Sequence, residues 1–149
     1  MEERKGAITF MKNPMTLIGP EVKVGDKAKD FEATKKDLSD FCLCELKGKT
    51  VVISVVPSID TPVCEEQTKI FNKEASEFKD VVILTISCDL PFAQANFCAA
   101  KGIDNLIMLS DYKAHDFGTK YGFLIKELMI LARGVVIIDK EGVVKYVEY

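Results

Sequence analysis

The sequence predicts one α/β domain, with a central sheet of mixed strand direction and helices on its faces. Two runs rich in β-branched residues, at 51–56 and 81–89, are apolar on both faces, which is typical of covered strands at the centre of a sheet. A helical pattern follows each run, and two strands around a glycine turn close the chain at 134–149. With 149 residues, 48% of them hydrophobic, the chain is long enough to bury one core.

The N-terminal third is expected to be β structure that leads into the first central strand. Asn13-Pro14 is a turn signal between two apolar segments, which predicts an N-terminal β-hairpin. A third segment alternates apolar and polar residues, as a half-buried strand does. These predicted elements are the strands 7–10, 15–19 and 30–34, followed by a turn at 46–50.

Two long helices are expected after the central strands. The first begins with Thr61 as N-cap and Pro62 as first helical residue, and its helical period continues to about Lys79. The second covers 90–102, and Gly102 ends it. We expect Cys98 to lie beside the apolar stripe of this helix and to point sideways or outward. That stripe is Phe92, Ala93, Phe97 and Ala100, and the remaining expected elements are a strand at 105–109 and a short helix at 113–121.

Charge and hydropathy exclude several classes of function. Lys and Arg number 20 against 23 Asp and Glu, a net charge of −3, so no basic surface is expected to bind nucleic acid. The apolar runs are far shorter than the ~20 residues that span a bilayer, so we expect no membrane segment. The charged N-terminus has no secretory signal, which favours the cytoplasm.

The counts of histidine and cysteine restrict the chemistry further. A single histidine, His115, rules out a His-rich metal centre, and we expect neither a metal nor an organic cofactor. The odd number of cysteines argues against a fully paired disulfide framework. The five cysteines, at positions 42, 44, 64, 88 and 98, are therefore either small core residues or reactive groups.

Cys64 has the most informative position of the five. It falls in the first turn of a predicted helix, directly after a central strand. Unpaired backbone N–H groups and the positive end of the helix dipole favour a thiolate there. Glu65 and Glu66 act in the opposite direction, but they project to other sides of the helix. From the residues alone, a reactive thiolate and a small core side chain remain equally open.

Pro57, Thr61 and Cys64 together spell P-x-x-x-T-x-x-C, which resembles the active-site pattern of the peroxiredoxins. Four longer strings resemble the thiol peroxidase branch, of the atypical 2-Cys type: 16–31, 57–72, 89–98 and 124–142. The resemblance covers nearly the whole chain and implies a single thioredoxin-like domain over 1–149. Chains of this branch usually continue past the final hairpin, so we expect a C-terminal segment to be missing.

The resemblance also implies roles for five residues. Cys64 matches the peroxidatic cysteine, whose thiolate attacks the O–O bond of a hydroperoxide. Thr61 matches the threonine that hydrogen-bonds this thiolate, and Arg133 matches the arginine that holds it and polarises the peroxide. Pro57 matches the proline that shields the pocket from water. Cys98 matches the resolving cysteine, which forms an intramolecular disulfide with Cys64.

The expected function is therefore a thiol-dependent peroxidase acting on hydrogen peroxide and organic hydroperoxides. By resemblance, thioredoxin reduces the Cys64–Cys98 disulfide and the protein is a homodimer. Because the two cysteines lie on different helices and a disulfide needs Cα atoms about 4.4–6.8 Å apart, we expect local unwinding when the bond forms. A redox sensor or binding module that uses the same switch is the alternative. A disulfide oxidoreductase is less favoured, because position 61 is threonine where C-x-x-C would require cysteine.

The other cysteines have no place in the family pattern. Cys88 ends a central strand and is expected to pack inside. Cys42 and Cys44 would share one side of a strand, where they could bind a metal or form a redox disulfide, although ordinary packing is favoured. His115 is expected on a helix surface.

Overall fold

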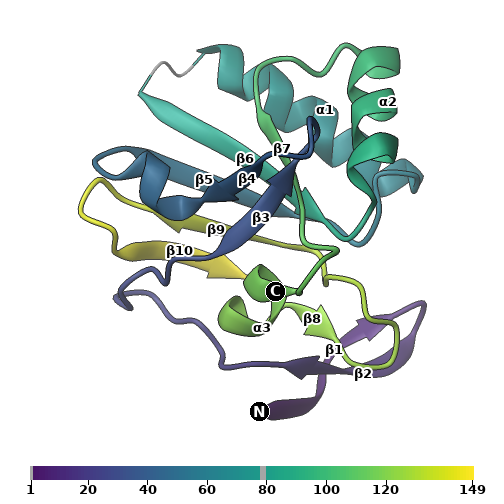
Figure 1. Ribbon diagram of the computed structural model, residues 1–149. Coiled ribbons are helices and arrows are strands. Elements are labelled where there is room, and N and C mark those ends of the chain that lie inside the picture. The colour runs from purple at the N-terminus through teal and green to yellow at the C-terminus, as the bar shows by residue number, and fades with distance from the viewer. Residues whose placement is uncertain (1, 78–79) are drawn as a thin grey trace.

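The computed structural model describes residues 2–77 and 80–149, and its centre is a seven-stranded sheet (Figure 1). The strands β5, β6 and β7 run parallel, and the neighbours on both sides of them are antiparallel. This confirms the predicted mixed sheet. In spatial order the strands are β10 (Val144–Glu148), β9 (Gly134–Ile138), β5 (Thr50–Val55), β6 (Val81–Ser87), β7 (Ile107–Ser110), β3 (Glu32–Lys35) and β4 (Asp40–Cys42).

Helices lie on both sides of this sheet, as predicted (Figure 1). The helices α1 (Pro62–Glu77) and α2 (Pro91–Lys101) lie on one side, and α3 (Asp116–Tyr121) lies on the other. A short 3₁₀ helix, η1 (Leu43–Leu46), connects β4 to β5. The sequence predicted that α1 continues to about Lys79, but 78–79 lie outside the described residues. No helix in the described ranges is long and apolar enough to cross a membrane.

The predicted N-terminal hairpin is present, but its turn lies two residues earlier than expected. The strands β1 (Glu3–Phe10) and β2 (Asn13–Ile18) pair antiparallel around Met11 and Lys12, whose φ values are 51° and 69°. Asn13 and Pro14 therefore belong to β2. Proline is tolerated there because the next strand, β8 (Leu124–Ile125), pairs only with the last two residues of β2.

The central strands separate two hydrophobic cores. On β5 the side chains of Val51, Ile53 and Val55 belong to the larger core, which includes the rings of Phe31 and Phe117. The smaller core lies on the side of α1 and α2. It consists of Val56, Ile59, Cys64, Phe97, Cys98, Ile103 and Met108. The fold therefore places both cysteines of the predicted redox pair in the same small cluster.

The predicted buried stripe of α2 is correct at Phe97, which is 8% exposed, but Ala93 is only half-buried and Ala100 is exposed. Phe92 is 63% exposed, and the buried residues of the helix include Gln94, which has no exposed surface, and Cys98, which is 5% exposed. The reason is that the buried amide of Gln94 needs hydrogen-bond partners inside the protein. The amide of Gln94 donates hydrogen bonds to Ser87 Oγ (3.1 Å) and to the carbonyl of Leu109 (2.7 Å), at the ends of β6 and β7. This rotates α2 so that Cys98 points inward, and the prediction that it points sideways or outward is wrong.

Asp111 fixes the start of α3. The residue is 2% exposed, and its carboxylate accepts the backbone N–H groups of Phe117 (3.0 Å) and Gly118 (2.8 Å). His115, expected on the surface of this helix, is the half-buried residue that precedes it. Burial raises the pKa of Asp111 from 3.8 to about 6, although both N–H groups act to lower it.

This shift predicts a pH dependence of stability. Because folding raises the pKa of Asp111, its stabilising contribution is complete below about pH 3.8 and is lost as the pH rises through about 6. A shift of this size is worth about 3 kcal/mol. Urea unfolding of the wild type and of Asp111→Asn should show a wild-type advantage that shrinks by about 2–3 kcal/mol between pH 4 and pH 7. A difference that does not change with pH would contradict the assignment.

Candidate active site

Thr61 caps the helix that carries Cys64, as predicted. Its hydroxyl oxygen accepts the backbone N–H of Cys64 (3.3 Å) and donates to the carbonyl of Ser58 (3.1 Å). Its own carbonyl accepts the N–H of Glu65 (2.9 Å). Cys64 is therefore the third residue of α1, next to the positive end of the helix dipole. Its side chain has no exposed surface.

Arg133 is hydrogen-bonded to Gln67, which lies one helix turn after Cys64 on α1. Arg133 directly precedes β9, whose first residue pairs with Val55 at the end of β5. Its Nη1 donates to Gln67 Oε1 (3.1 Å), and the Gln67 amide donates to Ser54 Oγ (2.7 Å). Gln67 follows Cys64 by three residues, so both lie on the same face of α1. Gln67 was not predicted from the sequence, although its spacing of three residues from Cys64 is the signal that could have identified it.

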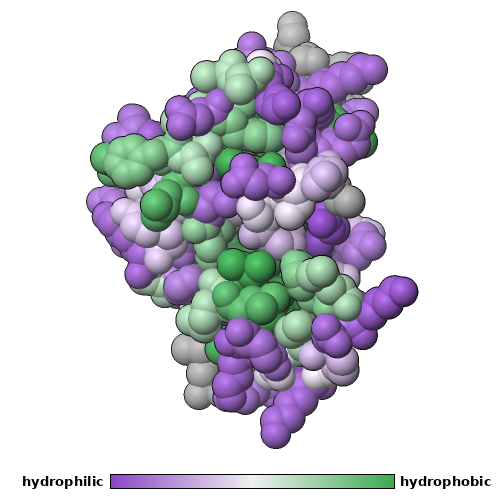
Figure 2. Space-filling view, turned by 90° about the vertical axis from the view of Figure 1, so that its right-hand side faces the viewer, coloured by the Kyte–Doolittle hydropathy of each residue, from purple (hydrophilic) through white to green (hydrophobic). Residues whose placement is uncertain are grey.

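Pro57 and Arg133 line the same open hollow. Pro57 is buried, Gln67 and Arg133 are half-buried, and all three contribute to its wall. The tip of the N-terminal hairpin and the last residues of the chain complete it. Figure 2 shows this end of the molecule, where hydrophobic side chains gather in two areas with hydrophilic side chains between them. Cys64 and Thr61 are not among the residues that line the hollow.

A carboxylate joins the loop before α1 to the loop before α2. Asp89 accepts hydrogen bonds from the Ser58 hydroxyl (3.0 Å), the Ile59 N–H (2.9 Å) and the Ser87 hydroxyl (2.7 Å). Ser87 also accepts the bond from Gln94 of α2. The starts of the two cysteine-bearing helices are thus tied together. Asp89 was not predicted from the sequence, although it directly follows a central strand, where functional side chains of α/β proteins gather.

Cys64, Cys88 and Cys98 are free thiols in this structure. Burial raises the pKa of Cys98. Burial, with a smaller effect of Asp111 and Asp89, raises the pKa of Cys88 to about 12. Cys88 packs against the larger core as expected, but it is only half-buried. Its thiol stays protonated at neutral pH. It is therefore a poor nucleophile. The predicted Cys64–Cys98 disulfide remains a prediction for the oxidised protein.

Cys42 and Cys44 differ from the expectation of ordinary packing, because the structure joins them in a disulfide. They do not share a strand. Cys42 is the last residue of β4, whereas Cys44 lies in η1. The change from strand to 3₁₀ helix between them places the Cα atoms 5.2 Å apart.

A mixed sheet with helices on both faces, and a thiol in the capped first turn of the helix after a central strand, define a thiol-based redox protein of the thioredoxin-like class. The pattern of the Redoxin family matches residues 23–149. The chain belongs to this family, as a peroxiredoxin of the thiol peroxidase branch, which confirms the resemblance seen in the sequence.

Similar proteins agree over most of the chain. The thiol peroxidase of Oceanobacillus iheyensis is 55% identical over 142 residues, which are 95% of this chain and 87% of the relative. That of Bacillus subtilis is 52% identical, over 95% and 85% of the two chains. A peroxiredoxin-like protein from Aquifex aeolicus is 46% identical and superposes with a TM-score of 0.86, over 92% of this chain and 81% of the other.

Proposed function

We propose that this chain reduces hydroperoxides with electrons from thiols, using Cys64 as peroxidatic and Cys98 as resolving cysteine. The observation that carries the proposal is the position of Cys64, in the capped first turn of α1 with Cys98 in the same small core. Thiol-dependent peroxide reduction agrees with the thiol peroxidase relatives and with the Redoxin match. The individual residue roles are our proposal.

In the first step the Cys64 thiolate attacks one oxygen of the hydroperoxide. An S–O bond forms, the O–O bond breaks, and the leaving alkoxide or hydroxide takes a proton, giving Cys64 sulfenic acid and an alcohol or water. The guanidinium of Arg133 stabilises the negative charge that develops on the leaving oxygen. Pro57 limits water at the reacting sulfur. The Thr61 hydroxyl, which now donates to Ser58, must turn to donate to the thiolate or the peroxide.

In the second step Cys98 attacks the sulfenic sulfur, and water leaves as the disulfide forms. Cys98 is 5% exposed, and burial raises its pKa, so its thiol stays protonated while α2 is closed. We therefore infer that the start of α1, part of α2, or both unwind before the disulfide forms. Structures of the reduced and oxidised protein should differ in these backbone segments, and identical backbones would contradict this step.

The partners are also part of the proposal. Thioredoxin is the proposed reductant, hydrogen peroxide and organic hydroperoxides are the substrates, and the reducing cytoplasm is the compartment. We further propose a homodimer. Leu90 and Phe92, at the start of α2, are 52% and 63% exposed and would suit a protein contact next to the site. Sedimentation of the wild type and of Phe92→Glu tests whether this surface joins two copies.

A coupled assay tests the proposed function. Thioredoxin, thioredoxin reductase and NADPH are mixed with the protein, and peroxide is then added. Sustained NADPH consumption supports the enzyme. One stoichiometric oxidation followed by no further consumption would instead favour a redox sensor with the same cysteines.

Replacing Cys98 with serine separates the two steps. We expect Cys98→Ser to consume one equivalent of peroxide, to accumulate Cys64 sulfenic acid, and to lose thioredoxin-dependent turnover, because no resolving thiol remains. Stopped-flow kinetics and trapping with a sulfenic-acid reagent measure the first two results. Cys88→Ser is the matched control and should turn over normally, since its protonated thiol takes no part. Normal turnover of Cys98→Ser would exclude Cys98 as the resolving cysteine.

A further inference from the structure

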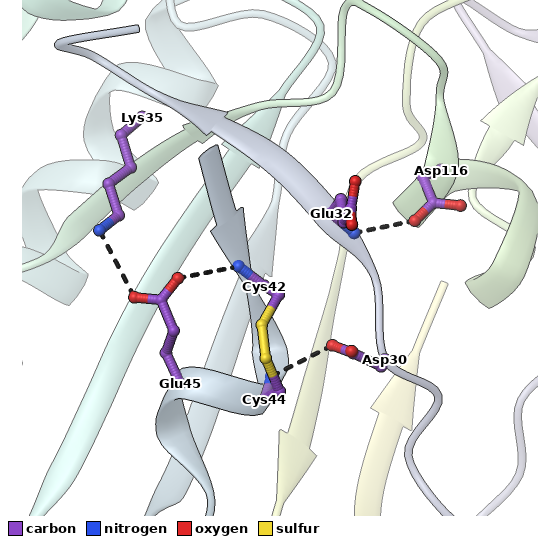
Figure 3. Close-up of a disulfide and its surroundings, with 7 residues drawn as sticks. All are labelled: Asp30, Glu32, Lys35, Cys42, Cys44, Glu45 and Asp116. Atoms are coloured by element: carbon purple, nitrogen blue, oxygen red, sulfur yellow. Dashed lines mark hydrogen bonds and ion pairs between the residues drawn. A yellow bond between two sulfur atoms is a disulfide. The ribbon is translucent and has the colours of Figure 1, made fainter. Parts of the chain in front are cut away.

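We propose that Cys42 and Cys44 form a second redox-active disulfide, which thiol reductants open and hydroperoxides close independently of Cys64 and Cys98. Figure 3 shows the bonded pair at the junction of β4 and η1. The peroxiredoxin pattern assigns no role to either residue. The proposal goes beyond the peroxidase activity, which depends on other cysteines.

The backbone holds the two cysteines in position with groups other than their sulfur atoms. The Glu45 carboxylate accepts the N–H of Cys42 (3.0 Å), and the Asp30 carboxylate accepts the N–H of Cys44 (3.1 Å) (Figure 3). Lys35 forms an ion pair with Glu45 (3.5 Å). Because these contacts do not depend on the disulfide, the sulfur atoms stay close when the bond is broken. Closing it again needs little backbone movement, in contrast to the Cys64–Cys98 bond.

The segments on both sides of the pair are anchored in the larger core. Phe41, directly before Cys42, is 1% exposed, and Leu46, two residues after Cys44, is 8% exposed. A disulfide that closes a loop this short removes little entropy from the unfolded chain. The bond therefore has little value as a structural crosslink, and a chemical role explains the pair better.

The disulfide is accessible to an attacking thiolate. Cys44 is exposed and Cys42 is half-buried. Cys44 lines an open hollow together with Leu43 and Leu46, and the charged residues around it are both basic and acidic. Thiol–disulfide exchange requires access to one sulfur of the bond.

This pair lies at the opposite end of the sheet from the proposed active site (Figure 1). The 3₁₀ helix η1 precedes the first residue of β5, whereas the loop that leads to Cys64 follows its last residue. A strand of six residues separates the two ends by on the order of 20 Å. Direct exchange between the two cysteine pairs of one chain is therefore excluded without large rearrangement, which makes the second pair a separate redox centre.

Atoms and electrons balance both when the Cys42–Cys44 disulfide is reduced and when it forms again. In reduction, two thiols convert the Cys42–Cys44 disulfide to two protein thiols and are themselves joined in a disulfide. In oxidation, one protein thiolate attacks a hydroperoxide and becomes a sulfenic acid with release of an alcohol or water. The second thiol then displaces water from that sulfur and restores the disulfide.

A soft metal ion is the competing occupant of this place. One oxygen of Asp30 and the sulfur atoms of Cys42 and Cys44 lie within 4.8 Å of one another. A metal would require both sulfurs as separate thiolates. In this structure the sulfurs are bonded to each other, which favours the redox function.

The test uses the full chain with Cys64→Ser and Cys98→Ser. Neither of the proposed catalytic cysteines can then react, so the result does not depend on whether the proposed function is correct. The protein is equilibrated with graded ratios of reduced to oxidised glutathione or with reduced thioredoxin, then alkylated and mapped by mass spectrometry. In the reduced samples we expect Cys42 and Cys44 to be alkylated together, two per chain. In samples from which the reductant is removed and to which peroxide is added before alkylation, both cysteines should be protected again. Cys88 serves as internal control and should not change.

A matched variant in the same background, with Cys44→Ser added, should leave Cys42 without its intramolecular partner and abolish the paired response. Comparison of the two reductants shows whether a small monothiol or a dithiol protein opens the bond. A disulfide that survives excess dithiol, or thiols that peroxide does not close, would overturn the proposal. One Zn²⁺ bound per reduced chain, with loss of peroxide closure, would identify a metal site instead.

A further measurement tests whether the Cys42–Cys44 pair is independent of the peroxidase cycle. In the otherwise unchanged chain, Cys42→Ser and Cys44→Ser should leave the steady-state peroxidase rate as it is. A lower rate in both variants, with an intact fold, would mean that the pair takes part in the main cycle and would overturn the claim of a separate centre.

Discussion

Replacing Cys64 with serine should abolish peroxide reduction. A serine hydroxyl is a poor nucleophile, whereas the sulfur of a cysteine is intrinsically a far better one. The O–O bond then has no attacking group, and Arg133 cannot supply one. We expect the rate of peroxide consumption to fall on the order of 10³-fold or more, measured by stopped-flow mixing of the reduced protein with hydrogen peroxide.

Folding must be separated from chemistry in this experiment. Cys64 is fully buried in the smaller core, where an unpaired serine hydroxyl costs about 1–3 kcal/mol. Cys64→Ala leaves no polar group and serves as the second variant. Cys88→Ser removes a thiol outside the proposed site and should keep the full rate. If both Cys64 variants are folded and still consume peroxide as fast as the wild type, Cys64 is not the peroxidatic residue.

The sequence predicted the fold well where hydrophobic patterns are continuous. The runs at 51–56 and 81–89 became β5 and β6, parallel neighbours within the sheet, because only covered strands can be apolar on both faces. Gly102, with φ of 68°, ends α2 as predicted. Local turn chemistry was less reliable. Asn13-Pro14 marked the hairpin, but the turn uses Met11 and Lys12 in left-handed conformations that neither residue type suggests.

The site was predictable where chain order determines position, and less so where side chains meet across the fold. Thr61 and Cys64 are neighbours on one helix turn, so their contact follows from the sequence. The burial of Cys98 does not, because it depends on Gln94 reaching atoms of β6 and β7. Asp89 was missed for a related reason, since Ser58 and Ile59 reach it only in the folded chain, although its third donor, Ser87, is two residues away.

Replacing Arg133 with methionine should slow the first oxidation strongly while leaving the fold intact. The guanidinium stays charged at every working pH and can direct several N–H donors at the leaving oxygen. Methionine keeps an unbranched apolar stem of similar reach but has no donor. Loss of a donor that stabilises developing negative charge costs about 10²–10³-fold in rate. Arg133→Lys keeps the charge without the planar fork, so its rate should lie between those of the wild type and the methionine variant.

Gln67 is the test of how Arg133 is positioned, because their side chains are hydrogen-bonded at 3.1 Å. Gln67→Leu should reduce the rate less than Arg133→Met, since the guanidinium is then mobile but still present. In the double variant the two effects should not add, because Gln67 acts through an arginine that is gone. The rates of the four proteins, measured by stopped-flow oxidation of Cys64, give the coupling directly. Full additivity would mean that Gln67 acts by another route, and an unchanged rate in Arg133→Met would remove Arg133 from the mechanism.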